Sequence, residues 1–191
     1  MRSAVELFRR DGFASTSVDE ICSAAGVTKG AFFHYFQSKE ALAEQCLGVW
    51  RDSAVRMVEK AWAGATGPVE RLHRFMDAFL TMLENPGDNA SCLAGTLVQE
   101  TSESNPKLRE AAGRCLGGAR DLCTKLIAEC AAESGRTVDA ASLAALWLSA
   151  LQGGLLLYKA FRDPRVPLDS LRHVKSYIDS QLGLTEGEGG V

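Results

Sequence analysis

Apolar residues recur along most of the chain every three or four positions, the spacing that places them on one face of an α-helix. The segments 38–62, 69–84 and 139–161 show this spacing over several turns. Gly, Pro, Asn and Asp gather between such segments, and no run alternates apolar with polar residues as a half-buried strand does. The pattern therefore predicts an all-α protein. The expected helices, N-caps included, cover about 1–11, 17–25, 29–36, 38–62, 69–84, 92–102, 105–134, 139–161 and 168–182.

Two short helices near the N-terminus are marked by their capping residues. Ser17 and Glu20 form an S-x-x-E capping box, in which each side chain binds a backbone amide of the other residue. Gly26 can take the left-handed conformation that ends a helix, and Thr28 is the next N-cap. Two helices across a short Gly-containing turn form a helix-turn-helix, whose second helix, here 29–36, lies in the major groove of DNA. An ordinary helical hairpin in a core is the alternative.

The residues of this region resemble a known family. The segment GVTKGAFFHYFQSKEAL is similar to the helix-turn-helix of the tetracycline-repressor (TetR) family of bacterial transcriptional regulators, and AVELFRRDGFASTSVDEI is similar to its first helix and connector. The resemblance covers about the first fifty residues. It implies a three-helix DNA-binding domain followed by a helical domain for dimerisation and for a small effector. The positions that match DNA contacts in the family are Thr28, Lys29, Ala31, Phe33, His34, Tyr35 and Lys39.

This sequence departs from the family pattern at two of those positions. Ala31 stands where the family often has Thr, and Phe33 where it often has Tyr, so one hydroxyl contact is absent at each. Apolar contact with a thymine methyl group could replace part of that. The first helix also begins almost at Met1, so either the basic arm of some family members is missing or the chain is clipped.

Charge restricts where DNA could bind. The 191-residue chain has a formal net charge of −3, so it is not a generally basic nucleic-acid binder. Residues 24–39 contain two lysines, one histidine and no acidic residue, which suits contact with phosphates. We expect DNA affinity to be local to this segment.

The long helix from Ser38 continues past the helix-turn-helix and stops at the GATGP sequence of residues 64–68. This predicts a DNA-binding domain at 1–50, an effector-binding and dimerisation domain at 51–184, and a disordered tail at 185–191, which has little apolar content.

The uncharged stretch 140–158 is about long enough to enter a bilayer, but Ser, Gln and Gly residues dilute it. We expect a helix buried within a protein and no membrane partner. Its apolar residues cover more than one face, more than one monomer needs to bury. The last two helices therefore predict a homodimer.

Few residues suggest chemistry. His34, His73 and His173 are far apart in sequence, and no nucleophile motif or Cys/His cluster is present, so we expect no enzyme, metal or cofactor. His73 and Asp77, four apart on one helix, could orient a ligand or bind a metal, but an exposed pair within the helix is the favoured interpretation. Apolar side chains of the second domain could line an effector cavity or simply fill a core. The candidate pocket residues are Phe75, Met76, Phe79, Met82, Cys92, Trp147, Leu151 and Tyr158.

The six cysteines come without a signal peptide, which favours a reducing cytoplasm. Cys92 follows a polar loop at the start of a helix, where the helix dipole stabilises a thiolate. The segment CLAGTLVQE also resembles a motif in a subgroup of TetR-type regulators, some of which respond to electrophiles or oxidants. Cys92 and Lys159 are thus a candidate redox sensor. The alternative function is a thiol-based sensor or cysteine-dependent enzyme whose DNA binding is vestigial, and the alternative for Cys92 itself is a small core residue.

Overall fold

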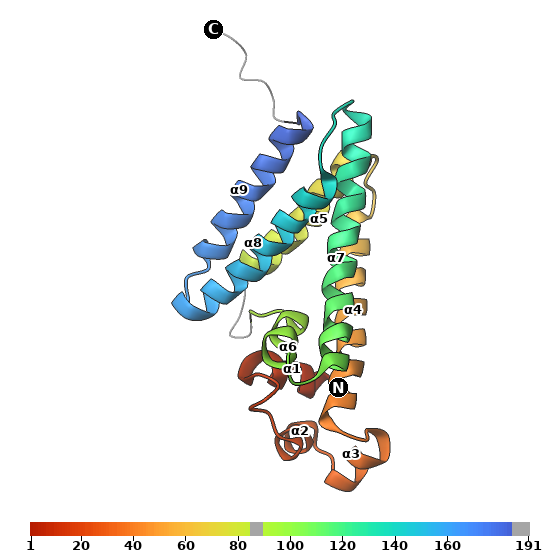
Figure 1. Ribbon diagram of the computed structural model, residues 1–191, viewed down its shortest axis with the longest axis vertical. Coiled ribbons are helices and arrows are strands. Elements are labelled where there is room, and N and C mark those ends of the chain that lie inside the picture. The colour runs from red at the N-terminus through yellow and green to blue at the C-terminus, as the bar shows by residue number, and fades with distance from the viewer. Residues whose placement is uncertain (85–89, 185–191) are drawn as a thin grey trace. The chain divides into compact units, whose positions relative to one another are not determined.

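The computed structural model describes residues 1–84 and 90–184, and these ranges form helices and no strand (Figure 1). The prediction of an all-α protein is confirmed. The helices are α1 (Arg2–Asp11), α2 (Val18–Ala25), α3 (Lys29–Tyr35), α4 (Lys39–Trp62), α5 (Pro68–Glu84), α6 (Leu93–Thr101), α7 (Pro106–Glu133), α8 (Ala140–Phe161) and α9 (Arg165–Leu182).

The predicted helix-turn-helix forms through local capping. The Ser17 hydroxyl accepts the Glu20 N–H, and the Glu20 carboxylate accepts the Ser17 N–H at 2.7 Å. The hydrogen bonds that the carboxylate accepts from the Ser17 N–H and from the Ser17 hydroxyl lower the pKa of Glu20. Gly26 ends α2 at a φ of 65°, and the Thr28 hydroxyl accepts the Ala31 N–H at the start of α3. Each of these features was predicted from the sequence.

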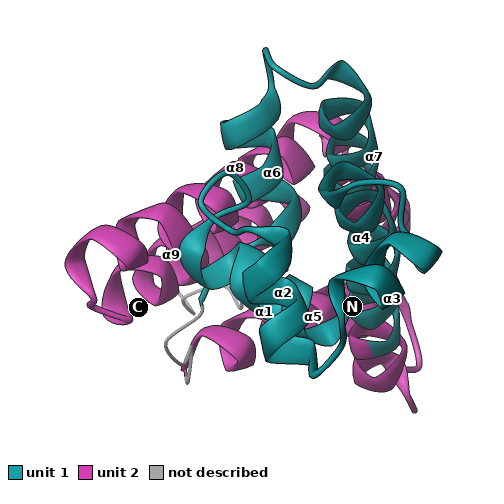
Figure 2. Ribbon diagram, turned by 90° about the horizontal axis from the view of Figure 1, so that it is seen from below, with its two compact units in different colours: residues 1–56, 87–117 teal, residues 57–86, 118–191 magenta. Residues whose placement is uncertain are grey.

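The chain divides into two compact units, which Figure 2 colours separately. Unit 1 contains residues 1–56 and 87–117, and unit 2 contains residues 57–86 and 118–191. Unit 1 thus extends beyond the predicted domain 1–50, because side chains of α6 and of the first turns of α7 are buried in the same core as α1 to α4. These side chains are Leu93, Ala94, Leu97, Leu108, Ala111 and Ala112. The predicted tail 185–191 lies outside the described residues.

Unit 2 contains α5, α8, α9 and parts of α4 and α7. α8 approaches α9 closely at Gly154, where a Cβ atom would lie 2.9 Å from the Pro167 Cβ. α5 is joined to α9 by polar contacts: His73 Nε2 lies 2.8 Å from Asp179 Oδ1, and Lys175 pairs with Asp77. The expected contact of His73 with Asp77 within one helix is therefore wrong, since each binds a residue of α9.

The last helix begins earlier than predicted, at Arg165 instead of Leu168. The sequence RDPRVP suggested a break, but Pro167 lies in the first turn of α9. The amides of a first turn have no partner within the helix, so a proline there removes no hydrogen bond. Asp163 accepts the Arg165 N–H and pairs with its guanidinium, which lowers the pKa of Asp163.

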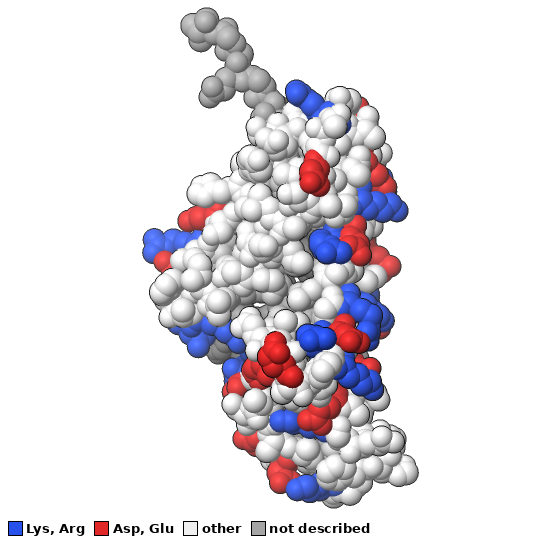
Figure 3. Space-filling view, viewed as in Figure 1, with Lys and Arg blue, Asp and Glu red and all other residues white. Residues whose placement is uncertain are grey.

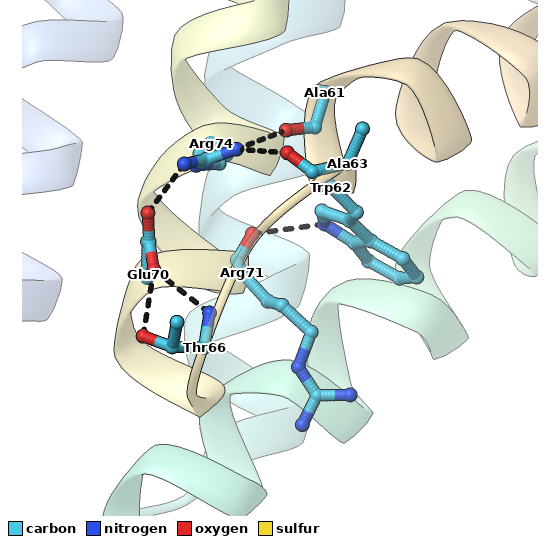
Figure 4. A network of polar contacts seen from close by, with 7 residues as sticks. All are labelled: Ala61, Trp62, Ala63, Thr66, Glu70, Arg71 and Arg74. Carbon is cyan, nitrogen blue, oxygen red and sulfur yellow. Dashed lines mark hydrogen bonds and ion pairs between the residues drawn. The ribbon is translucent and has the colours of Figure 1, made fainter.

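The turn between α4 and α5 is held by a polar network (Figure 4). The Glu70 carboxylate accepts the backbone N–H and the hydroxyl of Thr66, contacts that lower the pKa of Glu70, and it also pairs with Arg74. The Trp62 indole N–H donates to the Arg71 carbonyl at 3.0 Å. The C-terminal end of α4 is therefore fixed to the start of α5.

Among the described residues, α8 is the helix whose length and mean hydropathy would suit a membrane span. Of its most apolar stretch of 18 residues, 33% is buried inside the protein. One such helix is weak evidence for a membrane, because apolar helices of soluble proteins have the same properties.

Candidate nucleic-acid interface

α3 presents the residues expected to contact DNA. Its core side chain is Phe32, which is 4% exposed, whereas Phe33 is 51% and Tyr35 75% exposed. The Tyr35 ring packs edge-on against His34, with ring centroids 5.0 Å apart. Thr28, Lys29, Ala31 and His34 are also exposed. Six of the seven predicted contact residues thus lie at the surface of unit 1, and Lys39 is the exception.

Lys29 forms an ion pair with Asp19 of α2, with 3.0 Å between Nζ and the carboxylate, and both side chains are more than half exposed. The basic segment 24–39 has no acid of its own, but the fold supplies one from outside it. An exposed pair of this kind is weak, so a DNA phosphate could compete with Asp19 for the ammonium group.

Lys39 is turned toward the protein. Its Nζ donates to the carbonyl oxygens of Phe13 and Thr16, both at 2.8 Å, and lies 4.4 Å from the centre of the Phe13 ring. These groups belong to residues 12–16, which we call the connector between α1 and α2. Lys39 therefore fixes the connector to the start of α4, and its contact with DNA stays a prediction.

α6 holds the same connector from its other side. The Ala14 N–H donates to Glu100 Oε2 at 2.7 Å. Gly12, at a φ of 92°, lies so close that a Cβ atom would be 2.5 Å from Glu100 Oε1. No local pattern predicts this contact, because Ala14 and Glu100 are 86 positions apart in the chain. Glu100 has no special local pattern.

The N-terminal end of α6 is joined to α1 by a reciprocal pair of hydrogen bonds. Arg9 Nε donates to the Ser91 carbonyl, and the Ser91 hydroxyl donates to the Arg9 carbonyl, both at 3.0 Å. The Arg9 guanidinium also lies 4.7 Å from the centre of the Trp50 ring. Burial lowers the pKa of Arg9, while Cys92 and Glu6 act in the opposite direction. α6 is thus attached at both ends to the unit that contains α3.

Cys92 is the N-cap of α6, and its Sγ accepts the Gly95 N–H at 3.5 Å. It is half-buried. Burial raises the pKa of four other thiols: those of Cys46, Cys115 and Cys130 to about 11 and that of Cys123 to about 12. The two residues of the candidate redox sensor belong to different units, Cys92 to unit 1 and Lys159 to unit 2.

The other predicted pocket residues belong to unit 2. Phe79 of α5 packs on Phe75 at 5.2 Å and on Trp147 of α8 at 6.4 Å between ring centroids. Trp147 is 2% exposed and Met82 40% exposed. Phe75, Met76 and Leu151 are buried, and Phe79 and Tyr158 are half-buried. Across the described residues, no group of three or more His, Cys, Asp or Glu side chains could hold a metal ion.

Comparison with protein-family models identifies both parts of the chain. Residues 1–46 match the model of bacterial regulatory proteins of the tetR family, and residues 68–174 match the model of the C-terminal domain of LmrA/YxaF-like transcriptional regulators. The second match alone covers more than half of the 191 residues.

Individual proteins agree with this assignment. The HTH-type transcriptional repressor DhaR of Mycobacterium sp. (strain GP1) is 29% identical over 88% of this chain and 84% of its own length. The transcriptional regulator AcuR of Cereibacter sphaeroides is 32% identical, but the match spans about half of each protein, 52% of this chain and 46% of AcuR. A solved structure of the regulatory protein TetR from Rhodobacter sphaeroides, 26% identical, superimposes with a TM-score of 0.77 over 94% of this chain and 95% of that chain. The chain belongs to the TetR family and is a DNA-binding transcriptional regulator.

Proposed function

We propose that the protein is a repressor that binds a palindromic operator in the cytoplasm as a homodimer and leaves it when a small effector binds. The observation that best supports this is α3 itself, a capped helix with His34 and Tyr35 exposed on a unit whose connector is fixed by Lys39 and Glu100. DhaR is named a repressor, which favours repression over activation.

DNA binding is tested by fluorescence anisotropy with fragments from the region upstream of the gene. We expect reversible binding that weakens as salt rises, because phosphate contacts release counterions. Tyr35→Ala should weaken binding without changing the melting temperature, since its side chain is 75% exposed. Val55→Ala, on exposed α4 surface away from α3, is the matched control. Absence of binding at every salt concentration would contradict the proposal.

A homodimer is supported by the apolar surface that α8 leaves uncovered. Four large side chains on this helix are 40–65% exposed, and the visible face of α8 and α9 has few charged residues (Figure 3). A second copy of the same chain would cover such a surface by pairing α8 and α9 across a two-fold axis. The four side chains are Leu146, Leu156, Leu157 and Phe161.

The assembly is tested by light scattering at micromolar concentration. We expect twice the 20.5 kDa mass of one chain. Leu156→Lys should shift the protein toward the single-chain mass, because the new lysine would place a charge in the proposed dimer interface. Val55→Lys on α4 should leave the mass of the dimer unchanged. Two reading helices of a two-fold dimer contact half-sites separated by one or more turns of roughly 34–36 Å, so the monomeric variant should also lose operator affinity. A wild-type protein of 20.5 kDa would exclude the dimer.

Release by an effector requires a ligand with different affinity for two conformations of the protein. α4 is one continuous helix with residues 39–56 in unit 1 and 57–62 in unit 2, which makes it a direct link between the units. The proposal requires that at least one compound that stabilises the protein thermally also lowers its operator affinity.

A second candidate, sensing of electrophiles or oxidants by Cys92, is favoured by the N–H contact to its sulfur and by the raised pKa values of four other thiols. Maleimide labelling followed by mass spectrometry at pH 7.5 should then modify Cys92 before Cys115 or Cys123. Equal rates, or a Cys92→Ser variant that oxidants still release from DNA, would remove this candidate.

A further inference from the structure

Trp147 of α8 has a hydrogen-bond donor without an acceptor. Its side chain is buried, with 2% exposed, and its Nε1 is the buried side-chain polar atom without a hydrogen-bond partner among the described residues. Leaving such a group unpaired costs about 1–3 kcal/mol. Unpaired buried donors are few in native proteins, and one that persists needs an explanation.

The other indole of unit 2 shows that the fold can satisfy such a group. Trp62 donates its N–H to the Arg71 carbonyl at 3.0 Å. Trp147 lies in a helix, where neighbouring backbone carbonyls are already used, and its closest described ring partner is Phe79. The unpaired donor is thus specific to this position.

The described neighbours of the Trp147 side chain are apolar and aromatic. Phe79 meets the indole at 74° with ring centroids 6.4 Å apart, and Phe75 packs on Phe79. Phe79 itself is half-buried, so part of this aromatic cluster reaches the protein surface. Leu143, Ala144 and Leu151, one turn away on α8, are buried.

The charges near Trp147 favour an uncharged hydrogen-bond acceptor over a carboxylate. An indole N–H is neutral and donates one hydrogen bond. The lysine and arginine side chains of α5 and α9 are engaged in ion pairs. The pairs are Arg71 with Glu129, Arg74 with Glu70, Arg165 with Asp163, Arg172 with Asp169 and Lys175 with Asp77. A carboxylate beside Trp147 would therefore be a buried charge without a counter-ion, which is costly, whereas a carbonyl oxygen needs only the N–H.

We propose that Trp147 Nε1 binds a carbonyl oxygen of the effector, and that the effector is an uncharged, mainly apolar carbonyl compound whose hydrocarbon part contacts Phe79. The proposal rests on the proposed function in that it takes the bound molecule to be the effector. It adds the class of ligand and the residue that recognises it.

The experiment compares three probes of one shape: 2-acetylnaphthalene, 2-isopropylnaphthalene and 2-naphthoate. Affinities are measured by calorimetry, and the indole N–H signals of Trp50, Trp62 and Trp147 by ¹⁵N-resolved NMR. The ketone should bind about tenfold more tightly than the hydrocarbon, the value of one buried hydrogen bond, and should bind more tightly than the carboxylate. The ketone should also shift the indole N–H signal of Trp147. The hydrocarbon should not shift that signal in the same direction.

Variants assign the effect to one residue. Trp147→Phe should abolish the preference for the ketone, and Trp62→Phe should retain it. If Trp147→Phe fails to fold, the Trp147 signal is assigned by elimination from Trp50→Phe and Trp62→Phe, and the NMR comparison decides. The inference is wrong if ketone and hydrocarbon bind equally, or if no ketone in a wider panel moves the Trp147 signal.

Operator binding is measured separately with the same probes. A ketone that binds Trp147 without changing operator affinity would support the recognition site and contradict the proposed function. A compound that releases DNA while the Trp147 signal stays unchanged would support the function and contradict the inference.

Discussion

The two units differ in the groups that they leave available: unit 1 exposes aromatic side chains on α3, whereas unit 2 leaves a buried hydrogen-bond donor unpaired among the described residues. In unit 1, side chains distant in sequence hold loops and helix ends: Lys39 and Glu100 fix the connector, and Arg9 is bonded to Ser91. In unit 2, Trp147 has a donor with no acceptor and α8 exposes large apolar side chains. The proposed function accounts for this difference, because a DNA-binding unit needs a fixed shape, whereas a unit that binds an effector and a second copy must keep groups available for them.

The largest effect is expected from the substitution Lys39→Met in unit 1. Hydrogen bonds to charged groups contribute about 1.5–3 kcal/mol each, and Lys39 makes two at 2.8 Å, so the free energy of unfolding should fall by about 3 kcal/mol. Urea denaturation measures it. Lys29→Met is the control, because that lysine is in an exposed ion pair and should change stability by less than about 1 kcal/mol. If Lys39→Met and Lys29→Met lower the free energy of unfolding by similar amounts, the connector is not held by Lys39.

In unit 2, the packing of α8 on α9 is tested at adjacent glycines. Gly154→Ala places a Cβ 2.9 Å from Pro167, so it should lower the free energy of unfolding by about 1–3 kcal/mol. Gly153→Ala meets no atom within 4 Å and should be neutral or stabilise α8 by up to about 1 kcal/mol through helix propensity. Thermal unfolding of both proteins gives the comparison. A stabilised Gly154→Ala variant would show that the two helices can separate at no cost.

A smaller effect concerns the charge on the reading surface. Asp19→Asn frees Lys29 from its ion pair, so DNA affinity at low salt should rise several-fold while the melting temperature stays the same. Lys29→Met should lower affinity for all sequences and reduce the slope of log affinity against log salt by about 1. Anisotropy titrations at several salt concentrations measure both. An unchanged slope in Lys29→Met would remove Lys29 from the phosphate contacts.

The smallest expected effect is the acid sensitivity of the capping box. The pKa of Glu20 is lowered from 4.5 by its hydrogen bonds to Ser17, so its stabilising contribution is present above about pH 4.5 and is lost as pH falls through the folded pKa. Wild type should therefore exceed Glu20→Gln in melting temperature at pH 7, and the difference should shrink below pH 4. A difference that is constant with pH would show that the charge of Glu20 does not matter.

Local features of the fold were predictable from sequence, and distant contacts were not. The caps at Ser17, Gly26 and Thr28 depend on residues within one turn, so their pattern is visible in the chain. The roles of Glu100 and Lys39 depend on partners 86 and 23–26 positions away, which no periodicity shows. For the same reason the sequence did not predict the ion pairs between α5 and α9. It did suggest Trp147 as a pocket residue, but it did not predict that the indole N–H would lack a hydrogen-bond acceptor.

Because α6 is hydrogen-bonded at both of its ends within unit 1, its length cannot change freely. From Leu93 to Glu100 the helix advances seven positions, about 10 Å, and its two ends are hydrogen-bonded through Ser91 to α1 and through Glu100 to the connector. Inserting or deleting one residue would turn Glu100 by about 100° around the helix axis and carry it away from Ala14. Substitutions inside α6 can keep this spacing, whereas a change in the length of α6 would break at least one of its two attachments within unit 1.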